Sequence, residues 1–299
     1  MNETQQSRSG AVALFGRPNS GKSTLLNRLV GERVSIVTHK PQTTRHRVTG
    51  IVNRPGGQLV LVDTPGLHRR RDHALNRHLN RIAAEALRGV DIAVLVVDAS
   101  GPTEEDEAAA RAVAQAEVDC VLVFNKIDRV KLRSDLLPLA ETWSRKVKPL
   151  EVFFISALKG DGIDALADGL VGHLPAQPPL FPTDEFTTES LRFLAAEIVR
   201  EQLLENLHQE VPYGTTVVIE SFEEEPRRYR IGALIVVAEK RHKGMVIGQG
   251  AQTLKRIGIR ARKAMETLFE MRVHLDLTVR VEEGWTDREA DFGRLGYHR

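Results

Sequence analysis

The sequence predicts an α/β protein in two parts: a first domain with a mostly parallel sheet and helices on both faces, and a smaller α+β domain after it. Two observations predict this. Short apolar runs alternate with helical stretches up to about residue 172, and the order of elements changes after a proline-rich stretch at residues 172–182. A chain of 299 residues also suits two domains of ordinary size.

The first domain is predicted from its alternating pattern. Strands are expected at residues 11–15, 59–62, 92–97, 121–124 and 152–155. Helices are expected at residues 24–30, 74–87 and 104–116. This alternation is typical of parallel strands joined by crossover helices, which cover both faces of the sheet.

Four prolines among residues 172–182 predict the domain boundary, because proline cannot continue a helix and favours a stiff, extended connection. We therefore expect a first domain over residues 1–172, a linker over 173–183 and a second domain over 184–299. The second domain is predicted to contain a helix near residues 189–206, strands near 216–222 and 229–239, a glycine-containing turn at 244–250, a basic helix ending near 269 and a strand at 274–279.

Composition is that of an ordinary globular protein, with 41% hydrophobic and 27% charged residues and a net charge of only +2. Cys120 is the single cysteine and lies in an apolar run, so we expect it to fill the core. The polar N-terminus and the lack of a long apolar stretch predict a cytoplasmic protein, and peripheral association with the inner face of the cell membrane stays compatible with this. Between residues 239 and 263, eight Lys or Arg residues accompany one acid.

Residues 16–23 fit the phosphate-binding pattern G-x-x-x-x-G-K-[ST] between a predicted strand and a predicted helix. A glycine-rich turn in that place directs backbone N–H groups and the positive end of a helix at a phosphate. The alternative is a chance glycine–lysine turn, which the flanking strand and helix disfavour. The residues expected to hold the nucleotide's phosphates are Gly16, Arg17, Pro18, Asn19, Ser20, Gly21, Lys22, Ser23 and Thr24.

Two further polar motifs follow predicted strands, at the sheet edge where ligands of open α/β sheets bind. Asp63, Thr64, Pro65 and Gly66 are expected to contact the metal's water shell and the γ-phosphate, with Leu67 next to them. Asn125, Lys126 and Asp128 are expected to recognise guanine, because a carboxylate accepts two hydrogen bonds from its N1–H and 2-amino groups. Ser156, Ala157 and Leu158 would offer backbone N–H groups to the guanine oxygen.

These motifs resemble the P-loop GTPases related to translation factors, and nearly the whole chain resembles the Era family of ribosome-assembly GTPases. The resemblance implies GTP or GDP as ligand and Mg²⁺ held by Ser23, Thr44 and Asp63. It also implies Lys22, Thr44 and Gly66 as the catalytic residues; Thr43 stays open as an alternative switch threonine. Asn19 matches a position that helps to bind a monovalent cation in some relatives. Leu67 stands where Ras-type GTPases carry a glutamine that orients water, so we expect slow intrinsic hydrolysis.

The basic part of the second domain resembles a type II KH domain, in which a G-x-x-G turn clamps the backbone of about four single-stranded nucleotides. The last position of the turn is Ala251, which departs from the pattern. The alternative is an α+β domain with a basic surface that does not bind RNA. The residues expected to bind RNA are Lys243, Gly244, Ile247, Gly248, Gln249, Gly250, Lys255 and Arg256.

The resemblance implies a monomeric GTPase switch that binds the 3′ region of 16S ribosomal RNA and acts in assembly of the 30S ribosomal subunit. Two alternatives stay open at this stage. One is an ATP-using kinase or ATPase, which the guanine motif at residues 125–128 disfavours. The other is a guanine-nucleotide-regulated RNA-binding scaffold with little turnover.

Overall fold

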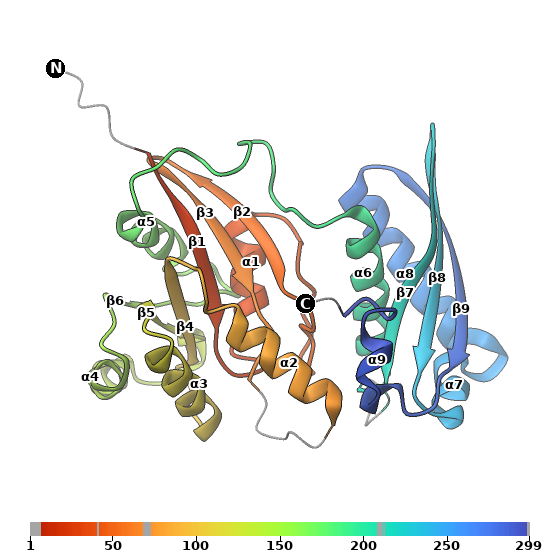
Figure 1. Ribbon diagram of the computed structural model, residues 1–299, viewed down its shortest axis with the longest axis horizontal. Coiled ribbons are helices and arrows are strands. Elements are labelled where there is room, and N and C mark those ends of the chain that lie inside the picture. Colours follow the sequence, from red (N-terminus) through yellow and green to blue (C-terminus); the bar gives the residue numbers. More distant parts are fainter. Residues whose placement is uncertain (1–6, 41, 68–72, 208–210, 212, 298–299) are drawn as a thin grey trace. The chain divides into compact units, whose positions relative to one another are not determined.

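The computed structural model describes residues 7–40, 42–67, 73–207, 211 and 213–297. The described residues form two compact units (Figure 1). The first contains the described residues among 1–35, 44–71 and 78–188. The second contains the described residues among 36–43, 72–77 and 189–299.

The first unit is built on a six-stranded sheet in the described part of the chain, with strand order β2-β3-β1-β4-β5-β6. Neighbouring strands are parallel, except that β2 pairs antiparallel with β3. The strands are β1 (Arg8–Phe15), β2 (Val48–Arg54), β3 (Gly57–Asp63), β4 (Ile92–Asp98), β5 (Asp119–Asn125) and β6 (Glu151–Phe154). The mostly parallel sheet expected from the alternating pattern is thus confirmed.

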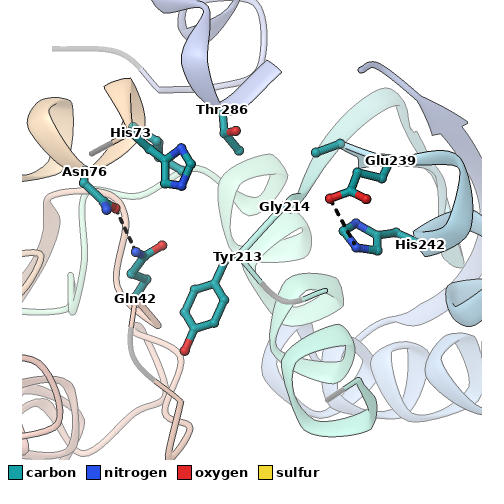
Figure 2. A pocket seen from close by; sticks show the side chains of 10 residues that line it. Gln42, His73, Asn76, Tyr213, Gly214, Glu239, His242 and Thr286 are labelled. Carbon is teal, nitrogen blue, oxygen red and sulfur yellow. Dashed lines mark hydrogen bonds and ion pairs between the residues drawn. The ribbon is translucent and has the colours of Figure 1, made fainter. Parts of the chain in front are cut away.

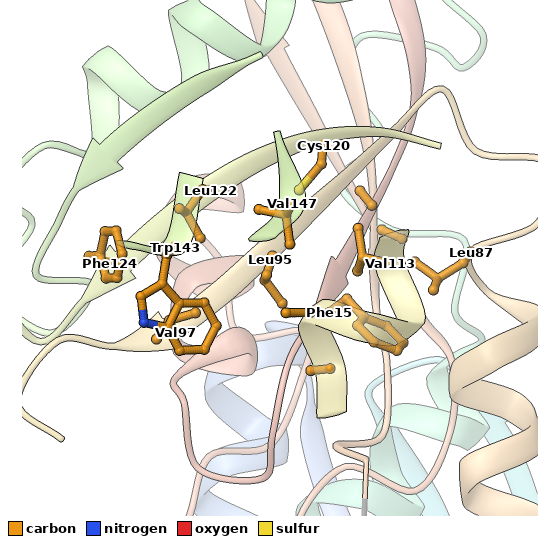
Figure 3. Packing of buried hydrophobic residues seen from close by; sticks show 14 of the residues in the cluster. Phe15, Leu87, Leu95, Val97, Val113, Cys120, Leu122, Phe124, Trp143 and Val147 are labelled. Atoms are coloured by element: carbon orange, nitrogen blue, oxygen red, sulfur yellow. The ribbon is translucent and has the colours of Figure 1, made fainter. Parts of the chain in front are cut away.

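Helices cover both faces of this sheet. They are α1 (Lys22–Val30), α2 (Ala74–Glu85), α3 (Glu104–Gln115), α4 (Leu136–Val147) and α5 (Ile163–His173). Side chains from α3 and α4, including Val113 and Trp143, pack with Phe15, Leu95 and Val97 of the central strands in one buried cluster (Figure 3). Cys120 lies in the same cluster, where burial raises the pKa of its thiol to about 12. An apolar sheet face of this kind is what the unbroken hydrophobic strands require.

The proline-rich stretch lies against the first unit. Ala176 forms an isolated bridge with Arg8, and Ser9 N–H donates to the Pro175 carbonyl (3.1 Å). The Gln58 side chain accepts hydrogen bonds from the backbone N–H groups of Leu180 and Phe181 at 2.8 and 2.9 Å. Residues 173–183 therefore run along the first unit, and the domain boundaries expected from sequence stay a prediction.

The second unit has a three-stranded sheet in its described residues, in the order β7-β8-β9. β7 pairs antiparallel with β8, and β8 pairs parallel with β9. The elements are α6 (Leu191–Asn206), β7 (Thr215–Glu225), β8 (Arg228–Val237), α7 (Lys240–Ile247), α8 (Gln252–Phe269), β9 (Arg272–Val281) and α9 (Glu289–Phe292). Apolar residues of α6, α7, α8 and the sheet, among them Val199, Val246 and Met265, form its core.

One sequence-based expectation for this unit is wrong. Residues 244–250 were expected to form a glycine-containing turn, but residues 240–247 form the helix α7, and the turn is limited to residues 248–251. Val246 is fully buried in the core, and this burial favours the helix. Gly244 is tolerated within it because tertiary packing outweighs the helix penalty of one glycine, which is about 1 kcal/mol. Within the described residues, no helix is both long and apolar enough to cross a membrane.

Candidate functional site

The turn between β1 and α1 can be built only with glycine at its two ends. Gly16 and Gly21 have φ angles of 150° and 101°, in the region that disfavours other residues. A Cβ atom on Gly16 would lie 2.5 Å from the Val96 carbonyl oxygen, and one on Gly21 would collide with the Asn125 side-chain amide. The backbone of this glycine-rich turn therefore lies tightly against β4 and β5. The helix α1 begins directly after it, and Thr24 lies at the start of that helix.

Lys22 is buried beneath this turn. Its Nζ donates to the carbonyl oxygens of Gly16 (3.0 Å) and Arg17 (2.9 Å). Burial lowers the pKa of Lys22 to about 8, and the nearby Asp63 carboxylate partly opposes that shift. A lysine held in this way is a cation aimed into a cradle of backbone N–H groups, the arrangement that binds phosphate.

Three oxygen-bearing side chains meet at the carboxyl end of β3. The Ser23 hydroxyl donates to Asp63 Oδ2 (2.5 Å), and the Thr44 hydroxyl lies 2.8 Å from Ser23 Oγ and 3.4 Å from Asp63 Oδ2. Asp63 is fully buried, and burial raises its pKa despite these hydrogen bonds. Its Oδ1 makes no hydrogen bond to any residue that the structure describes. Hard oxygen donors and a buried carboxylate oxygen without a partner fit a Mg²⁺ ion.

The two candidate switch threonines have different surroundings. The Thr43 hydroxyl donates to the Lys40 carbonyl (2.6 Å) and lies 2.7 Å from Thr38 Oγ1. Only the Thr44 hydroxyl lies beside Ser23 and Asp63. The geometry therefore favours Thr44 as the metal-binding threonine.

The turn after β3 lies against the phosphate-binding turn. A Cβ atom on Gly66 would overlap the Pro18 backbone, so only glycine allows the two turns to approach so closely. The Thr64 hydroxyl donates to the Leu14 carbonyl (2.8 Å), and Pro65 is buried. Leu67 packs on the core cluster of the first unit. Residues 68–72, which follow Leu67 in the sequence, lie outside the described residues.

Asn125 and Lys126 connect the guanine motif to the phosphate-binding turn. Asn125 Nδ2 donates to the Ser20 carbonyl (2.9 Å), and its Oδ1 accepts from the N–H groups of Lys126 (2.8 Å) and Ala157 (3.0 Å). Lys126 Nζ donates to the Asn19 carbonyl (2.6 Å) and to Asp98 Oδ2 (2.7 Å). The Asn125 side chain thereby joins the phosphate-binding turn, its own loop and the loop at Ala157.

Asp128 is exposed and is oriented by a neighbouring loop. The Ser156 hydroxyl donates to Asp128 Oδ1 (2.5 Å). Lys159 N–H in turn donates to Ser156 Oγ at 3.2 Å. Leu158 is 63% exposed. The carboxylate is thus held in place and accessible, as recognition of a base edge requires.

Three contributors at this edge were not predicted. The Ser35 hydroxyl donates to Asp63 Oδ2 (2.9 Å), and Arg28 donates to the Leu158 carbonyl (2.8 Å). The third is Asp98, which accepts from Lys126 and from Arg17 (3.3 Å). Its position at the end of β4 could have indicated this role. Ser35 and Arg28 lie in no motif, so no local pattern identifies them.

The second unit has a groove of about 350 Å³ between α8 and β9. Leu275 and Leu277 of β9 line it together with Leu254 of α8, and Lys255 and Arg262 add positive charge. The helix α8 approaches β9 closely at Gly258, where a Cβ atom would lie 3.3 Å from Leu277 Cδ1. An apolar groove with basic edges is suited to bases and backbone of single-stranded RNA.

The turn at residues 248–251 leads into this groove. Gly248, Gly250 and Ala251 have positive φ angles of 72°, 55° and 60°. Ala251 and Lys255 are groove-lining residues, and Arg256 is exposed on the following turn of α8. Of the other expected RNA-binding residues, Lys243 and Gly244 lie exposed on α7, Ile247 ends that helix, and Gln249 is exposed in the turn.

Both parts of the chain are similar to known protein families. The family described as 50S ribosome-binding GTPase matches residues 11–126, and the KH domain family matches residues 210–286. GTPase Era of Xanthomonas oryzae pv. oryzae (strain MAFF 311018) is 52% identical over 290 residues, covering 97% of both chains. GTPase Era of Stenotrophomonas maltophilia (strain K279a) is 49% identical over 297 residues, covering 99% of this chain and 100% of that one.

Two solved structures share the whole fold. One is a variant of Aquifex aeolicus Era bound to GDP·AlF4⁻, with a TM-score of 0.93 and 36% identity. The other is Era in complex with MgGDPNP and nucleotides 1506–1542 of 16S ribosomal RNA, with a TM-score of 0.94 and 36% identity. Each match covers 98% of this chain and 100% of the other. With these identities over nearly its full length, the chain belongs to the Era family of GTPases, enzymes that hydrolyse GTP.

Proposed function

We propose that this protein is a GTP-dependent switch that binds the 3′ region of 16S ribosomal RNA through its KH domain and acts in assembly of the 30S ribosomal subunit. The observation that carries the proposal is that one chain holds both a pre-shaped nucleotide site and an apolar groove with basic edges. The related Era protein with MgGDPNP and 16S ribosomal RNA nucleotides supports the same pairing of ligands.

The phosphates and metal would be held by Lys22, Ser23, Thr44 and Asp63. Lys22 places a cation beside the phosphate-binding N–H groups, and Asp63 supplies the buried carboxylate that balances a divalent ion. A Mg²⁺ ion held by Ser23, Thr44 and Asp63 would supply positive charge that offsets the negative charge developing on the phosphates. Asn19 has a positive φ of 60° in the turn, and its carbonyl accepts a hydrogen bond from Lys126. This bond uses the Asn19 backbone, so the side chain could still help to hold a monovalent cation.

Guanine would be read by Asp128. Its carboxylate is exposed and is fixed by Ser156, so it can accept from the N1–H and 2-amino groups of guanine. Adenine lacks that donor pair, so its binding would displace water from the Asp128 carboxylate without giving hydrogen bonds in return, which is unfavourable. Backbone N–H groups after Ser156 would face the guanine oxygen.

Hydrolysis would be slow without a partner. Leu67 packs on the hydrophobic core and has no polar atom to orient water. Gly66 lies against Pro18 and can offer only its N–H to the γ-phosphate. The site therefore favours a long-lived GTP state, which suits a switch that reports on assembly.

The guanine assignment is tested by Asp128→Asn in the full chain. Affinity for GTP should fall about 10- to 100-fold, because an amide cannot accept both guanine donors. Xanthosine triphosphate carries a carbonyl in place of the 2-amino group, and it should gain affinity because the amide N–H₂ can donate to it. Isothermal titration calorimetry measures the affinity of the unmodified protein and of the variant for each nucleotide. Unchanged GTP affinity would place guanine recognition elsewhere.

A further inference from the structure

A second hollow lies in the second unit, apart from the groove between α8 and β9. Its volume is about 170 Å³, and all its lining residues belong to residues 36–43, 72–77 and 189–299. Figure 2 shows polar side chains around it: Gln42 and Asn76 on one side, Glu239 and His242 on the other, with His73 and Tyr213 between them. Together they surround a space that neither the nucleotide site nor the groove uses.

His242 is the strongest indication that this hollow binds something. Its side chain is only 2% exposed, yet within the described residues neither ring nitrogen makes a hydrogen bond. The nearest charged group is Glu239, with Oε1 3.8 Å from Nε2. A buried imidazole without a hydrogen bond is unfavourable. A polar ligand atom in the hollow would give His242 the hydrogen bond that it lost when it was removed from water.

The opposite side of the hollow carries an amide pair. Gln42 Nε2 donates to Asn76 Oδ1 (2.8 Å), and Asn76 is 7% exposed. Gln42 Oε1 and Asn76 Nδ2 make no hydrogen bond within the described part of the chain. One acceptor and one donor group are therefore available there, facing the acidic side across the hollow.

The residues that line the hollow exclude an anion and favour a nucleic-acid base. Among the described lining residues there is no Lys or Arg, whereas Glu239 carries a carboxylate whose pKa is lowered, chiefly by its hydrogen bond from Arg241. A carboxylate, an imidazole and two amides are the groups that read base edges, since carboxylates accept from cytosine N4 and amides pair with adenine N6 and N7. A volume of 170 Å³ is that of about six water molecules, close to a single base.

We propose that this hollow binds one unstacked base of the RNA strand held by the groove between α8 and β9. The base is adenine or cytosine, in which the amino group lies next to an unprotonated ring nitrogen on the Watson–Crick edge. The proposal rests on the RNA-binding function proposed above. Glu239 accepts from the amino group, His242 gains its missing partner, and Tyr213, which is 36% exposed, offers an aromatic face for stacking.

The helix α7 connects the two places. Glu239 and His242 lie at its start, and the turn at residues 248–251 follows its end. Eight residues of helix span roughly 12 Å, which about four stacked nucleotides cover at 3.4 Å each. Lys243 is exposed on the same helix and can accompany the phosphates of that strand. A base beyond the clamped segment can therefore reach the hollow.

The test is a base-preference scan with the full chain in one fixed nucleotide state. RNAs of ten nucleotides carry uridine or cytosine in place of adenine at each position in turn, and their Kd values are measured by fluorescence anisotropy. In the unmodified protein one position outside the clamped segment should favour adenine or cytosine over uridine about tenfold. Glu239→Gln should remove that preference and leave the preferences of the clamped segment unchanged.

Glu283→Gln is the matched control, because Glu283 is also an acid beside Lys240 but does not line the hollow. Both variants lose one negative charge, so both should bind all RNAs slightly more tightly; only Glu239→Gln should change a base preference. If the two variants give the same scan, the base site is refuted while RNA binding stands. If replacing Lys255 and Arg256 by Glu leaves every Kd unchanged, the RNA-binding function itself fails, and the inference fails with it.

Discussion

The nucleotide site and the RNA groove hold their functional side chains in opposite ways. In the first unit, Lys22, Asp63 and Asn125 are buried and bonded to other protein groups. In the second, Lys255 and Arg256 are exposed and make no ion pair or hydrogen bond within the described residues. The first site binds through fixed contacts, and the second through shape and an electrostatic field. They should therefore respond differently to mutation, salt and pH.

The largest effect is expected from Lys22→Ala. Loss of a buried cation aimed at the transferred phosphate should lower kcat/KM for GTP by about 10²–10³-fold, the size of effect seen when one preorganised charge-stabilising donor is removed. Phosphate release measures it. Lys159→Ala is the control: Lys159 is exposed in the same unit and should give unchanged rates. Equal rates for all three proteins would contradict the fixed-contact view of this site.

The groove should show a smaller but salt-dependent effect. Replacing Lys255 and Arg256 by Glu should weaken RNA binding on the order of 10–100-fold at low salt and reduce the salt slope by about 1.4, or 0.7 per lost phosphate contact. GTP affinity should not change. The charge-matched control replaces Lys131 and Arg133, which are exposed in the first unit. RNA binding that falls equally in both double variants would show a general charge effect instead of a groove.

A pH effect should appear only at the nucleotide site. Burial lowers the pKa of Lys22 to about 8 in the free protein, and neighbouring phosphates favour its charged form. Binding above pH 8 thus requires proton uptake, so affinity for GDP should fall with rising pH, by at most tenfold per pH unit. Titrations from pH 7 to 9.5 test this. Lys22→Met should abolish the slope, and a slope that persists in this variant belongs to another group.

The smallest effect concerns the turn before α8. Ala251 has a φ of 60°, a left-handed conformation that disfavours alanine. Ala251→Gly should stabilise the protein by about 0.5–1 kcal/mol, the relief of strain less the added chain entropy of glycine. Urea unfolding measures the change. Gln252→Gly is the control at a right-handed position with φ −64°, where the same residue should destabilise.

The sequence predicted the nucleotide site more fully than the rest, because each of its motifs directly follows an apolar strand. The strand β2 was missed: it carries Gly50, Asn53 and Arg54, and it pairs antiparallel through a turn at Gly56. α7 was mistaken for a turn because Gly244 conceals a helix that Val246 anchors in the core.

Contacts between distant residues could not be predicted from local patterns. Ser35 reaches Asp63 across 28 positions, and Gln42 meets Asn76 across 34. The hollow beside His242 depends on chain segments separated by about 200 residues, so no motif marks it. Spacing identifies residues that act together on one loop, and only the fold identifies those that meet from several.

The bonds from Asn125 and Lys126 to the phosphate-binding turn have a practical consequence for altering base specificity. Since Asn125 holds the Ser20 carbonyl and Lys126 holds the Asn19 carbonyl, replacing either residue also loosens the turn that holds the phosphates. Weaker nucleotide binding in such variants therefore cannot be credited to the base. Asp128 is bonded to Ser156 and not to that turn. A redesign that changes the accepted base while keeping catalysis should begin at Asp128 and leave its two neighbours in place.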